Sequence, residues 1–209
     1  MRILVTAGPT REYFDSVRFI SNPSSGKMGF AIAAEAAARG HDVVLVSGPV
    51  AIADPSNVRV VHVISAEEMF DAAVSAFEDR HAAVMTAAVC DYRPTRRLDH
   101  KLKKENRVRP IQLRPTQDIC AYLGRTKGDR VVVGFAMEDH DHRVNAERKL
   151  QRKHCDAIVL NGIENVAGDD AEIEILRADR GWQAAIGGSK VVLAEVVVDL
   201  VEDLLDETL

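Results

Sequence analysis

Val43-Val44-Leu45-Val46 is the stretch of this sequence that decides the fold. A strand made only of apolar residues has no face suited to water, and such strands occur in parallel sheets that helices cover on both faces. Similar runs occur at residues 3–7 and 82–87, and residues 27–39 and 66–79 have the apolar spacing of amphipathic helices. The resulting order, strand-helix-strand-helix-strand, predicts an α/β fold with a Rossmann-like, doubly wound and mostly parallel sheet.

The rest of the chain continues this alternation and then departs from it. The expected elements are, in order, a short helix from about Gln117, a strand at residues 131–135, a helix at about 143–153 and a strand at 157–160. Residues 172–177 and 183–186 flank Asp179-Arg180-Gly181, which predicts a C-terminal antiparallel hairpin. Residues 190–205 have the spacing of a closing helix, and we expect one domain over residues 1–209.

Length and composition are those of an ordinary globular protein: 209 residues, of which 46% are apolar and 28% charged. The formal net charge of −5 argues against a general nucleic-acid-binding protein, whose affinity depends on neutralising phosphates. We find neither a signal-peptide core nor an apolar run near the ~18 residues of a membrane span, so we expect a cytoplasmic protein that does not bind a membrane. The three cysteines form no CxxC pair and predict reduced thiols, not a disulfide framework or a zinc site.

A strongly basic segment interrupts the alternation at about residues 92–115. Over residues 93–109, eight Lys or Arg residues stand against Asp99 and Glu105, a local net charge of +6. Few large apolar residues occur there, so we expect a protruding basic arm rather than core. A solvated loop would also explain such a run, but the alternation of Lys101-Leu102-Lys103-Lys104 puts two lysines on one face, where they would meet a polyphosphate.

The turn after the first strand lies where doubly wound sheets bind ligands, at the carboxyl end of a parallel strand. It reads Thr6-Ala7-Gly8-Pro9-Thr10 and lacks the GxGxxG pattern of dinucleotide-binding turns. Pro9 also removes an amide donor that a pyrophosphate would use. The sequence therefore argues against NAD or FAD as a ligand.

A connection of about twenty residues follows this turn and ends in Ser21-Asn22-Pro23-Ser24-Ser25-Gly26-Lys27-Met28-Gly29, a length that suggests a function. Backbone N–H groups and the dipole at the start of the next helix favour a bound phosphate or carboxylate. The stretch resembles the end of a P-loop but does not meet its pattern, because no Gly stands five residues before Gly26 and Met28 replaces the magnesium-binding hydroxyl. A serine N-cap on a tightly packed helix is the structural alternative.

Small or polar residues also stand at the ends of later strands. Thr86-Ala87-Ala88-Val89-Cys90-Asp91-Tyr92 would let a planar ring approach the backbone, with Asp91 accepting hydrogen bonds, and Phe135 would stack on a base. Lys149 and Lys153 share one helix face with no obvious carboxylate partner, which suits a shared anion. A turn role for Asp91, a core role for Phe135 and solvated lysines are the alternatives. The histidines form no HExxH or triad-like pattern, and we propose no metal-ligating residue.

Taken together, these motifs resemble phosphopantothenoylcysteine synthetase, the ligase step of coenzyme A synthesis. The resemblance covers nearly the whole chain, and its motifs occur in the family's order and spacing. They are residues 17–22 continued by 24–29, then 87–93, 101–104, 134–136, and 146–153 with Asn161. The sequence departs from the family at Gly8-Pro9-Thr10, where a second glycine is common, and at Cys90, where alanine is usual.

The resemblance implies a two-step ligation with 4′-phosphopantothenate and cysteine as substrates and CTP, with Mg²⁺, as co-substrate. The carboxylate attacks the α-phosphate of CTP, pyrophosphate leaves, and the amine of cysteine then displaces CMP from the acyl-cytidylate. A homodimer is also implied, with the basic arm reaching toward the partner's active site. Many bacterial members are fused to a flavin-dependent decarboxylase; without that half we expect a stand-alone synthetase that binds no FMN, with a separate decarboxylase as a further candidate partner.

The family's functional residues match individual positions in this sequence. The resemblance assigns Asn22 to the acyl-cytidylate and Lys101 to the second half-reaction, as the catalytic residues. Arg18 and Ala88 would contact the phosphopantothenate portion. The nucleotide-binding positions would be Gly8, Ser25, Gly26, Ala87, Asp91, Lys101, Gln117, Asp118, Ile119, Phe135, Lys149 and Lys153.

Two other functions stay open as alternatives. A non-catalytic nucleotide-binding regulator on the same Rossmann-like fold would need the sheet and the glycine turns but has no use for Lys101 or Asn22. A short-chain NAD(P) oxidoreductase ranks lowest, because no TyrxxxLys pair stands at an appropriate helix position. The choice of CTP also stays open against ATP, which the family's eukaryotic branch uses.

Overall fold

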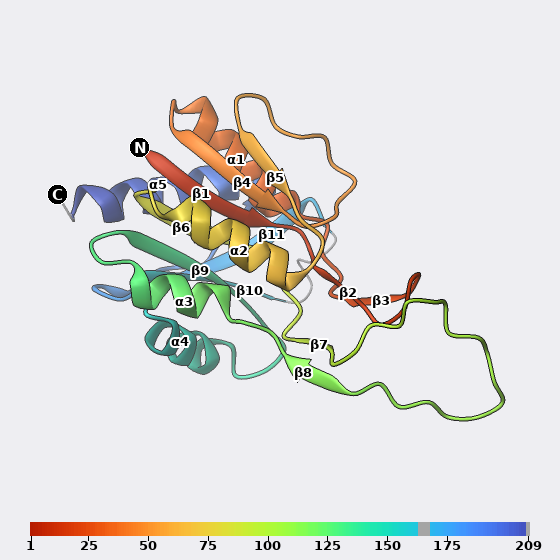
Figure 1. The fold of residues 1–209 in the computed structure, drawn as a ribbon. Helices are drawn as coiled ribbons and strands as arrows, with labels where there is room; N and C mark the ends of the chain where they lie inside the picture. Colours follow the sequence, from red (N-terminus) through yellow and green to blue (C-terminus); the bar gives the residue numbers. More distant parts are fainter. Residues whose placement is uncertain (163–167, 208–209) are drawn as a thin grey trace.

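The computed structural model of the protein describes residues 1–162 and 168–207, in which a large mixed sheet carries helices on both faces (Figure 1). The parallel part of the sheet consists of β1 (Arg2–Ala7), β4 (Asp42–Ser47), β5 (Arg59–His62), β6 (Ala82–Met85), β9 (Val131–Glu138) and β10 (Ala157–Gly162). Across the sheet these strands stand in the order β5-β4-β1-β6-β9-β10. This is the strand order of a Rossmann fold, with its reversal between β1 and β6, and it confirms the predicted fold class.

β5 is a strand that the sequence did not predict. It pairs in parallel with β4 and ends the sheet at that edge. Its apolar residues Val60 and Val61 are only half-buried and stand between Arg59 and His62. An edge strand is not buried on both faces, so its apolar run is too short to be recognised as a strand from the sequence.

The opposite edge of the sheet is antiparallel. β11 (Asp170–Arg177) pairs with β10, and both β12 (Gly181–Trp182) and β13 (Ile186–Ser189) pair with β11. The predicted C-terminal hairpin is confirmed, although its second strand is split into β12 and β13 instead of running over residues 183–186. The closing helix is present as α5 (Lys190–Asp206).

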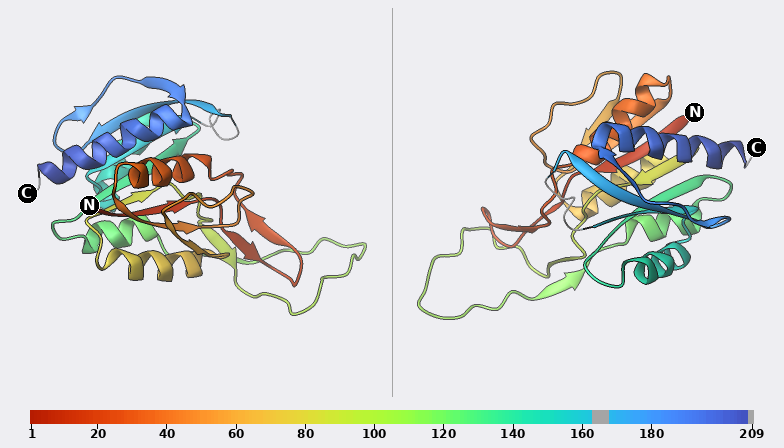
Figure 2. Two further views of the ribbon diagram at one scale, coloured as in Figure 1. Left: turned by 90° about the horizontal axis from the view of Figure 1, so that it is seen from above. Right: turned by 180° about the vertical axis from the view of Figure 1, so that it is seen from behind.

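Two layers of helices cover the sheet (Figure 2). α1 (Lys27–Ala38) and α5 pack against one face, and α2 (Ala66–Phe77), α3 (Ile119–Thr126) and α4 (His142–Lys153) cover the other. Val43 and Val44 are both buried and lie in the two different cores, as expected for a strand that is apolar on both faces. Within the described parts of the chain, no helix is long and apolar enough to cross a membrane.

Two small hairpins extend beyond the carboxyl ends of the parallel strands. β2 (Arg11–Tyr13) pairs with β3 (Phe19–Ser21), and β7 (Tyr92–Pro94) pairs with β8 (Leu113–Pro115). The basic arm, residues 92–115, begins with β7, ends with β8 and projects away from the sheet between them (Figure 1). It passes beside the β2–β3 hairpin, where the Leu98 amide donates to the Phe14 carbonyl oxygen at 3.0 Å. The arm is therefore attached to the hairpin at Leu98, while at its base Arg93 forms an ion pair with Glu67 of α2.

α1 lies very close to the ends of β1 and β6. Gly29 faces these strands, and a Cβ there would stand 2.6 Å from Ala7 Cβ and 2.4 Å from Thr86 Oγ1. Neither distance leaves room for a side chain in a close-packed interior. The absence of a side chain at Gly29 therefore lets the first turn of α1 rest directly on the sheet.

Gly29→Ala should lower the free energy of unfolding by roughly 1–3 kcal/mol, because the added methyl group must push α1 away from β1 and β6. This loss should appear although Ala is the better helix former by about 1 kcal/mol. Urea unfolding followed by circular dichroism measures the change.

Gly187→Ala is the matched control, because a Cβ at Gly187 has Ala171 O at 4.0 Å as its nearest neighbour. Its free energy of unfolding should change by less than ~0.5 kcal/mol. Equal stabilities of the two variants would contradict the close packing of α1.

Candidate active site

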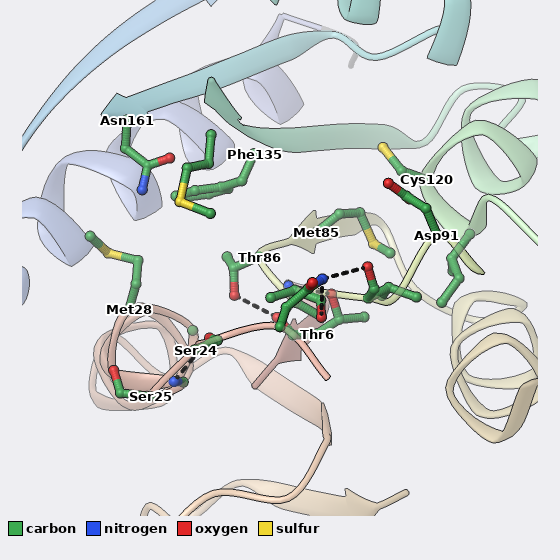
Figure 3. A pocket seen from close by; sticks show the side chains of 18 of the residues that line it. Thr6, Ser24, Ser25, Met28, Met85, Thr86, Asp91, Cys120, Phe135 and Asn161 are labelled. Carbon is green, nitrogen blue, oxygen red and sulfur yellow. Dashed lines mark hydrogen bonds between the residues drawn. The ribbon is translucent and has the colours of Figure 1, made fainter. Parts of the chain in front are cut away.

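A cavity of about 440 Å³ opens at the carboxyl ends of β1 and β6, where the strand order reverses (Figure 3). Its walls come from segments that are far apart in the chain. They are Thr6, residues 22–29 before and in α1, residues 85–89 and 91 after β6, residues 116–120 at the start of α3, Phe135 and Met137 of β9, Lys149 and Lys153 of α4, Asn161 of β10, and Ala171 and Lys190. Rossmann-like sheets bind ligands at this reversal, because the adjoining connections leave toward opposite faces of the sheet and open a crevice.

Most of the residues that the sequence predicted for the site lie on the wall of this cavity. They are Asn22, Ser25, Gly26, Ala87, Ala88, Asp91, Gln117, Asp118, Ile119, Phe135, Lys149 and Lys153. Gly8, Arg18 and Lys101 do not line it. The fold thus brings most of the predicted positions together, while the function of each one stays a prediction.

Gly8 supports the cavity from behind its lining. Its φ of 73° belongs to the left-handed region that favours glycine, and a Cβ there would lie 2.8 Å from Val50 Cγ1. Its carbonyl oxygen accepts a hydrogen bond from the Ala88 amide at 2.9 Å. Gly26, with a φ of 77°, packs against it, since a Cβ on Gly26 would be 3.4 Å from Gly8 Cα. These two glycines let the turn after β1 meet the start of α1.

α1 begins at the cavity without a side-chain cap. Its N-cap residue is Gly26, so the serine N-cap that the sequence left open is wrong. Ser24 and Ser25 instead accept hydrogen bonds from the amides of Gly26 at 3.3 Å and Lys27 at 3.5 Å. The positive end of the helix dipole therefore borders the cavity, an arrangement that suits a phosphate or carboxylate.

Asn22 joins two walls of the cavity. Its Nδ2 donates to the carbonyl oxygens of Ala88 at 3.2 Å and Val89 at 3.0 Å. These bonds hold the segments after β1 and β6 together. No described residue donates to Asn22 Oδ1, so that oxygen is the part of the side chain left to accept a hydrogen bond from a ligand.

Lys149 and Lys153 have carboxylate partners, contrary to the interpretation of the sequence. Lys149 Nζ lies 2.5 Å from Glu138 Oε1, and Lys153 Nζ lies 3.3 Å from Asp118 Oδ2. Glu138 ends β9 and Asp118 is the N-cap of α3, so neither pair is visible in the spacing of α4 itself. Burial opposes the charge on Lys153, but the nearby Cys120 and Asp118 outweigh it and raise the pKa of the ammonium group.

Two lysines that were not among the predicted site residues also line the cavity. Lys27 Nζ lies 2.5 Å from Asp169 Oδ1, and Lys190 Nζ donates to the Gly168 carbonyl oxygen at 2.6 Å. Burial, followed by the charge of Lys27, lowers the pKa of Lys190. Lys27 had a signal in the sequence, as the end of the serine-glycine motif, whereas Lys190 stands at the start of α5, remote from every motif.

Lysines outnumber carboxylates among the side chains that line the cavity. The lysines are Lys27, Lys149, Lys153 and Lys190 and the carboxylates are Asp91 and Asp118, while Glu138 and Asp169 pair with two of the lysines from outside the lining. Phe135 adds a half-buried aromatic ring. A planar group with several negative charges is the kind of ligand that this combination fits.

Arg18 takes part in the attachment of the basic arm, and Lys101 lies beside it. The Leu102 amide donates to Asp15 Oδ2 at 3.0 Å, and the Leu102 carbonyl oxygen accepts from Arg18 Nη2. The buried Asp15 carboxylate also accepts from the amides of Val17 at 2.8 Å and Arg18 at 2.7 Å. Lys101, next to this anchored residue, is exposed and makes no hydrogen bond or ion pair within the described chain.

Comparison with known proteins relates nearly the whole chain to one family. The family model described as the DNA/pantothenate metabolism flavoprotein C-terminal domain matches residues 1–205. A crystal structure of the C-terminal domain of the Coenzyme A biosynthesis bifunctional protein CoaBC is 36% identical and superposes with a TM-score of 0.84, covering 99% of this chain and 96% of that chain.

The curated relatives are longer than this chain. A Coenzyme A biosynthesis bifunctional protein CoaBC of Vibrio vulnificus (strain CMCP6) is 39% identical over 209 residues, which cover 97% of this chain and 52% of the relative. A protein named Cysteine/Cysteine sulfinic acid decarboxylase, from an unknown prokaryotic organism, is 47% identical over 166 residues, which cover 78% of this chain and 46% of the relative. The chain spans about half the length of the curated relatives it matches.

Asp15→Asn should loosen the basic arm. The carboxylate accepts hydrogen bonds from three backbone N–H groups, and the NH₂ group of the asparagine would face one of these donors instead of accepting from it. Limited digestion with trypsin measures this, and cleavage within residues 93–109 should become several-fold faster. Asp99→Asn removes an exposed carboxylate from the same arm and should leave the cleavage rate unchanged. Equal rates in the two variants would mean that Asp15 does not anchor the arm.

The stabilising effect of Asp15 should also depend on pH. Burial opposes ionisation, but the amides of Arg18, Val17 and Leu102 outweigh it and hold the pKa of this carboxyl below its usual value. Such a group contributes stability that is present above the unfolded pKa and is lost as the pH falls through the folded pKa. The difference in Tm between wild type and Asp15→Asn should therefore shrink as the pH falls below about 4, and a constant difference would contradict this account.

Proposed function

The chain belongs to the family of DNA/pantothenate metabolism flavoprotein C-terminal domains, and we propose that it is a phosphopantothenoylcysteine synthetase, which joins 4′-phosphopantothenate to cysteine. A curated relative at 39% identity is named for coenzyme A biosynthesis, to which this ligation belongs. The observation that carries the proposal is the cavity at the strand reversal, where four lysines face two carboxylates. A nucleoside triphosphate and a phosphorylated acid are both polyanions, and lysines on the cavity wall are the groups that would bind them.

The proposed ligation has two steps. First, a carboxylate oxygen of 4′-phosphopantothenate attacks the α-phosphorus of CTP, and pyrophosphate leaves with the electron pair of the broken P–O bond. Second, the amine of cysteine attacks the carbonyl carbon of the acyl-cytidylate, loses a proton and expels CMP. The mixed anhydride is needed because a free carboxylate has no usable leaving group, whereas CMP leaves readily.

Neutralising charge is the main task of the cavity in this proposal. The four cavity lysines and the start of α1 oppose the charge of the triphosphate and the charge that develops on the departing pyrophosphate. Mg²⁺ would arrive with the nucleotide and neutralise its phosphates, since such ions commonly bind through substrate phosphates and one or two carboxylates. Among the described residues no three His, Cys, Asp or Glu side chains converge to hold a metal ion, and we assign no protein ligand to Mg²⁺.

The acyl-cytidylate would form along the wall that Asn22 and Ala88 share. Asn22 would hold it, through the oxygen that no described residue uses, and Ala88 with Arg18 would contact the phosphopantothenate portion. Ala87 and Phe135 would flank the nucleotide, as small and aromatic cavity residues. These assignments extend the family's pattern to the positions that match it here.

A second copy of the chain would complete the site. Lys101 lies outside the cavity of its own chain, which supports an arm that acts on a partner. The arm and the neighbouring hairpin also expose apolar side chains that a partner would bury. They are Val17, Phe19, Tyr92, Val108, Ile111 and Leu113, of which Val108 is 93% exposed. We therefore propose a homodimer. CTP and both substrates would bind in the cavity of each subunit.

The protein should release pyrophosphate from CTP only in the presence of 4′-phosphopantothenate, cysteine and Mg²⁺ when turnover is measured at steady state. A coupled pyrophosphate assay measures this release, and chromatography identifies the nucleoside monophosphate. ATP in place of CTP is the matched comparison and should be turned over more slowly, because Lys101-Leu102-Lys103-Lys104 resembles the motif of the CTP-using branch.

Four results would count against parts of this proposal. Pyrophosphate release without phosphopantothenate would reject the ligase, and nucleotide binding with no turnover would favour a nucleotide-binding regulator. An ATP rate equal to or above the CTP rate would reject the choice of nucleotide. Carbon dioxide released from cysteine alone would instead support the activity for which one relative is named.

Lys101→Gln should stop amide formation and leave the first half-reaction intact, so that acid quenching recovers a species carrying both CMP and the pantothenoyl acid. Arg96→Gln removes another exposed positive charge from the arm and should keep wild-type turnover. If Lys101 is only a surface charge, its loss should change stability by ~0.5 kcal/mol or less and leave turnover unchanged. Wild-type turnover in Lys101→Gln would reject its catalytic role.

Mixed subunits test which chain the arm serves. Asn22→Asp should be inactive, since it replaces the donor to Ala88 and Val89 by a carboxylate beside a phosphodiester. Exchange of Lys101→Gln with Asn22→Asp subunits should restore activity at the one site that combines both intact residues. Exchanged heterodimers with no activity would show that each arm serves its own subunit.

A further inference from the structure

Two cysteines meet at the edge of the cavity. Cys120 Sγ and Cys155 Sγ lie 3.4 Å apart, although 35 residues separate them in the chain. Cys120 belongs to the first turn of α3 and lines the cavity (Figure 3), whereas Cys155 follows α4 and is buried. Cys90 is also buried, but its sulfur lies near the carbonyl oxygens of Thr10 and Ile20 instead. The pair therefore joins one thiol that a small molecule can reach to one that it cannot.

Close packing around the pair keeps the two sulfurs together. A Cβ on Gly134 of β9 would lie 3.2 Å from Cys155 Sγ and 3.4 Å from Cys120 Sγ, so the absence of a side chain at Gly134 makes room for both. A Cβ on Gly124 would lie 1.9 Å from the Lys153 carbonyl oxygen, so α3 touches the end of α4 directly. The short distance between the sulfurs is thus a consequence of how two helices and a strand pack.

The surroundings favour a negative charge on Cys120. Either thiol can donate in the hydrogen bond between the two sulfurs, but Cys120 lines the cavity beside Lys153. The hydrogen bond with Cys155, with help from Lys153, outweighs burial and the opposing Asp118, so the pKa of the Cys120 thiol is lowered. The start of α3 adds the positive end of a helix dipole. The same hydrogen bond, together with burial, raises the pKa of Cys155. Cys120 is therefore the nucleophile of the pair and Cys155 the proton donor.

We propose that Cys120 and Cys155 form a dithiol that peroxides oxidise to an intramolecular disulfide on the wall of the cavity. The Cys120 thiolate attacks one oxygen of the peroxide and the O–O bond breaks. The other oxygen departs as hydroxide, and Cys120 becomes a sulfenic acid. Cys155 then loses its proton, its sulfur attacks the Cys120 sulfur, and the sulfenic oxygen departs as water. The sulfenic acid at Cys120 carries no charge, so the anion that opposed ionisation of Cys155 is gone. Cys155 therefore loses its proton more readily in this second step than in the reduced pair.

The disulfide would join two parts of the candidate active site. The first turn of α3 carries Asp118, and the last turn of α4 carries Lys153, which already form an ion pair across the same contact. Closing the sulfur–sulfur distance from 3.4 Å to about 2.05 Å requires only a small approach of these turns. The modification is thus compatible with the packing seen in the reduced protein.

Peroxide treatment of the full chain tests the proposal directly. Of the three thiols titrated before treatment, two should be lost, with a mass lower by two hydrogens and a peptide that links Cys120 to Cys155. Dithiothreitol should restore all three. Cys90→Ser should behave like the wild type in every respect except for its missing thiol. Retention of all thiols, a link that contains Cys90 or a link between two chains would overturn the proposal.

Variants at Cys155 separate the two roles assigned to it. Cys155→Ser keeps a hydrogen-bond donor but no resolving sulfur, so Cys120 should stop at a sulfenic acid that dimedone labels, while its alkylation by iodoacetamide at neutral pH stays within about twofold of the wild-type rate. Cys155→Ala removes the donor as well, and the alkylation rate should fall several-fold. Equal alkylation rates in Ala and Ser variants that retain the wild-type circular dichroism spectrum would overturn the role of Cys155 as donor.

Discussion

The close contact of α1 with the ends of β1 and β6 is the constraint on which the rest of the structure depends. It exists because three positions lack a side chain: Gly29 faces the strands, and Gly8 and Gly26 both face Val50. This contact brings the uncapped first turn of α1 to the point where the strand order reverses. Asn22 then reaches across to the segment after β6, and the cavity is closed on that side.

Positively charged side chains occur in two regions of this protein, the cavity and the basic arm, and are held differently in each. In the cavity, lysines from separate helices are held by groups at its rim, as Lys149 is by Glu138 and Lys27 by Asp169, so their positions are set before any ligand arrives. In the basic arm, the backbone at Leu102 is held, while the neighbouring Lys101 is exposed and makes no hydrogen bond or ion pair with any described residue. A cavity of paired lysines and an exposed cation on an anchored arm would suit the two steps of the proposed ligation, which need different groups.

The positions of the candidate site residues were predictable to the extent that they follow parallel strands. Carboxyl ends of neighbouring parallel strands meet at one edge of a sheet, so Ala87, Asp91 and Phe135 were expected to lie together, and all line the cavity. The partners of Lys149 and Lys153 were not predictable, because Glu138 and Asp118 belong to other elements. Lys190 was missed for the same reason, since it reaches the cavity from the start of the last helix.

The sequence by itself determined most of the sheet, the described helices and the family, because these depend on local patterns: strands apolar on both faces, helical spacing between them and motifs of adjacent residues. It also located the basic arm, since a run of like charge cannot be buried. Only the tertiary structure decided that β5 forms the edge of the sheet, which charges pair and that Cys120 meets Cys155. These features are contacts between residues distant in the chain, and packing, not sequence pattern, sets the distances between them.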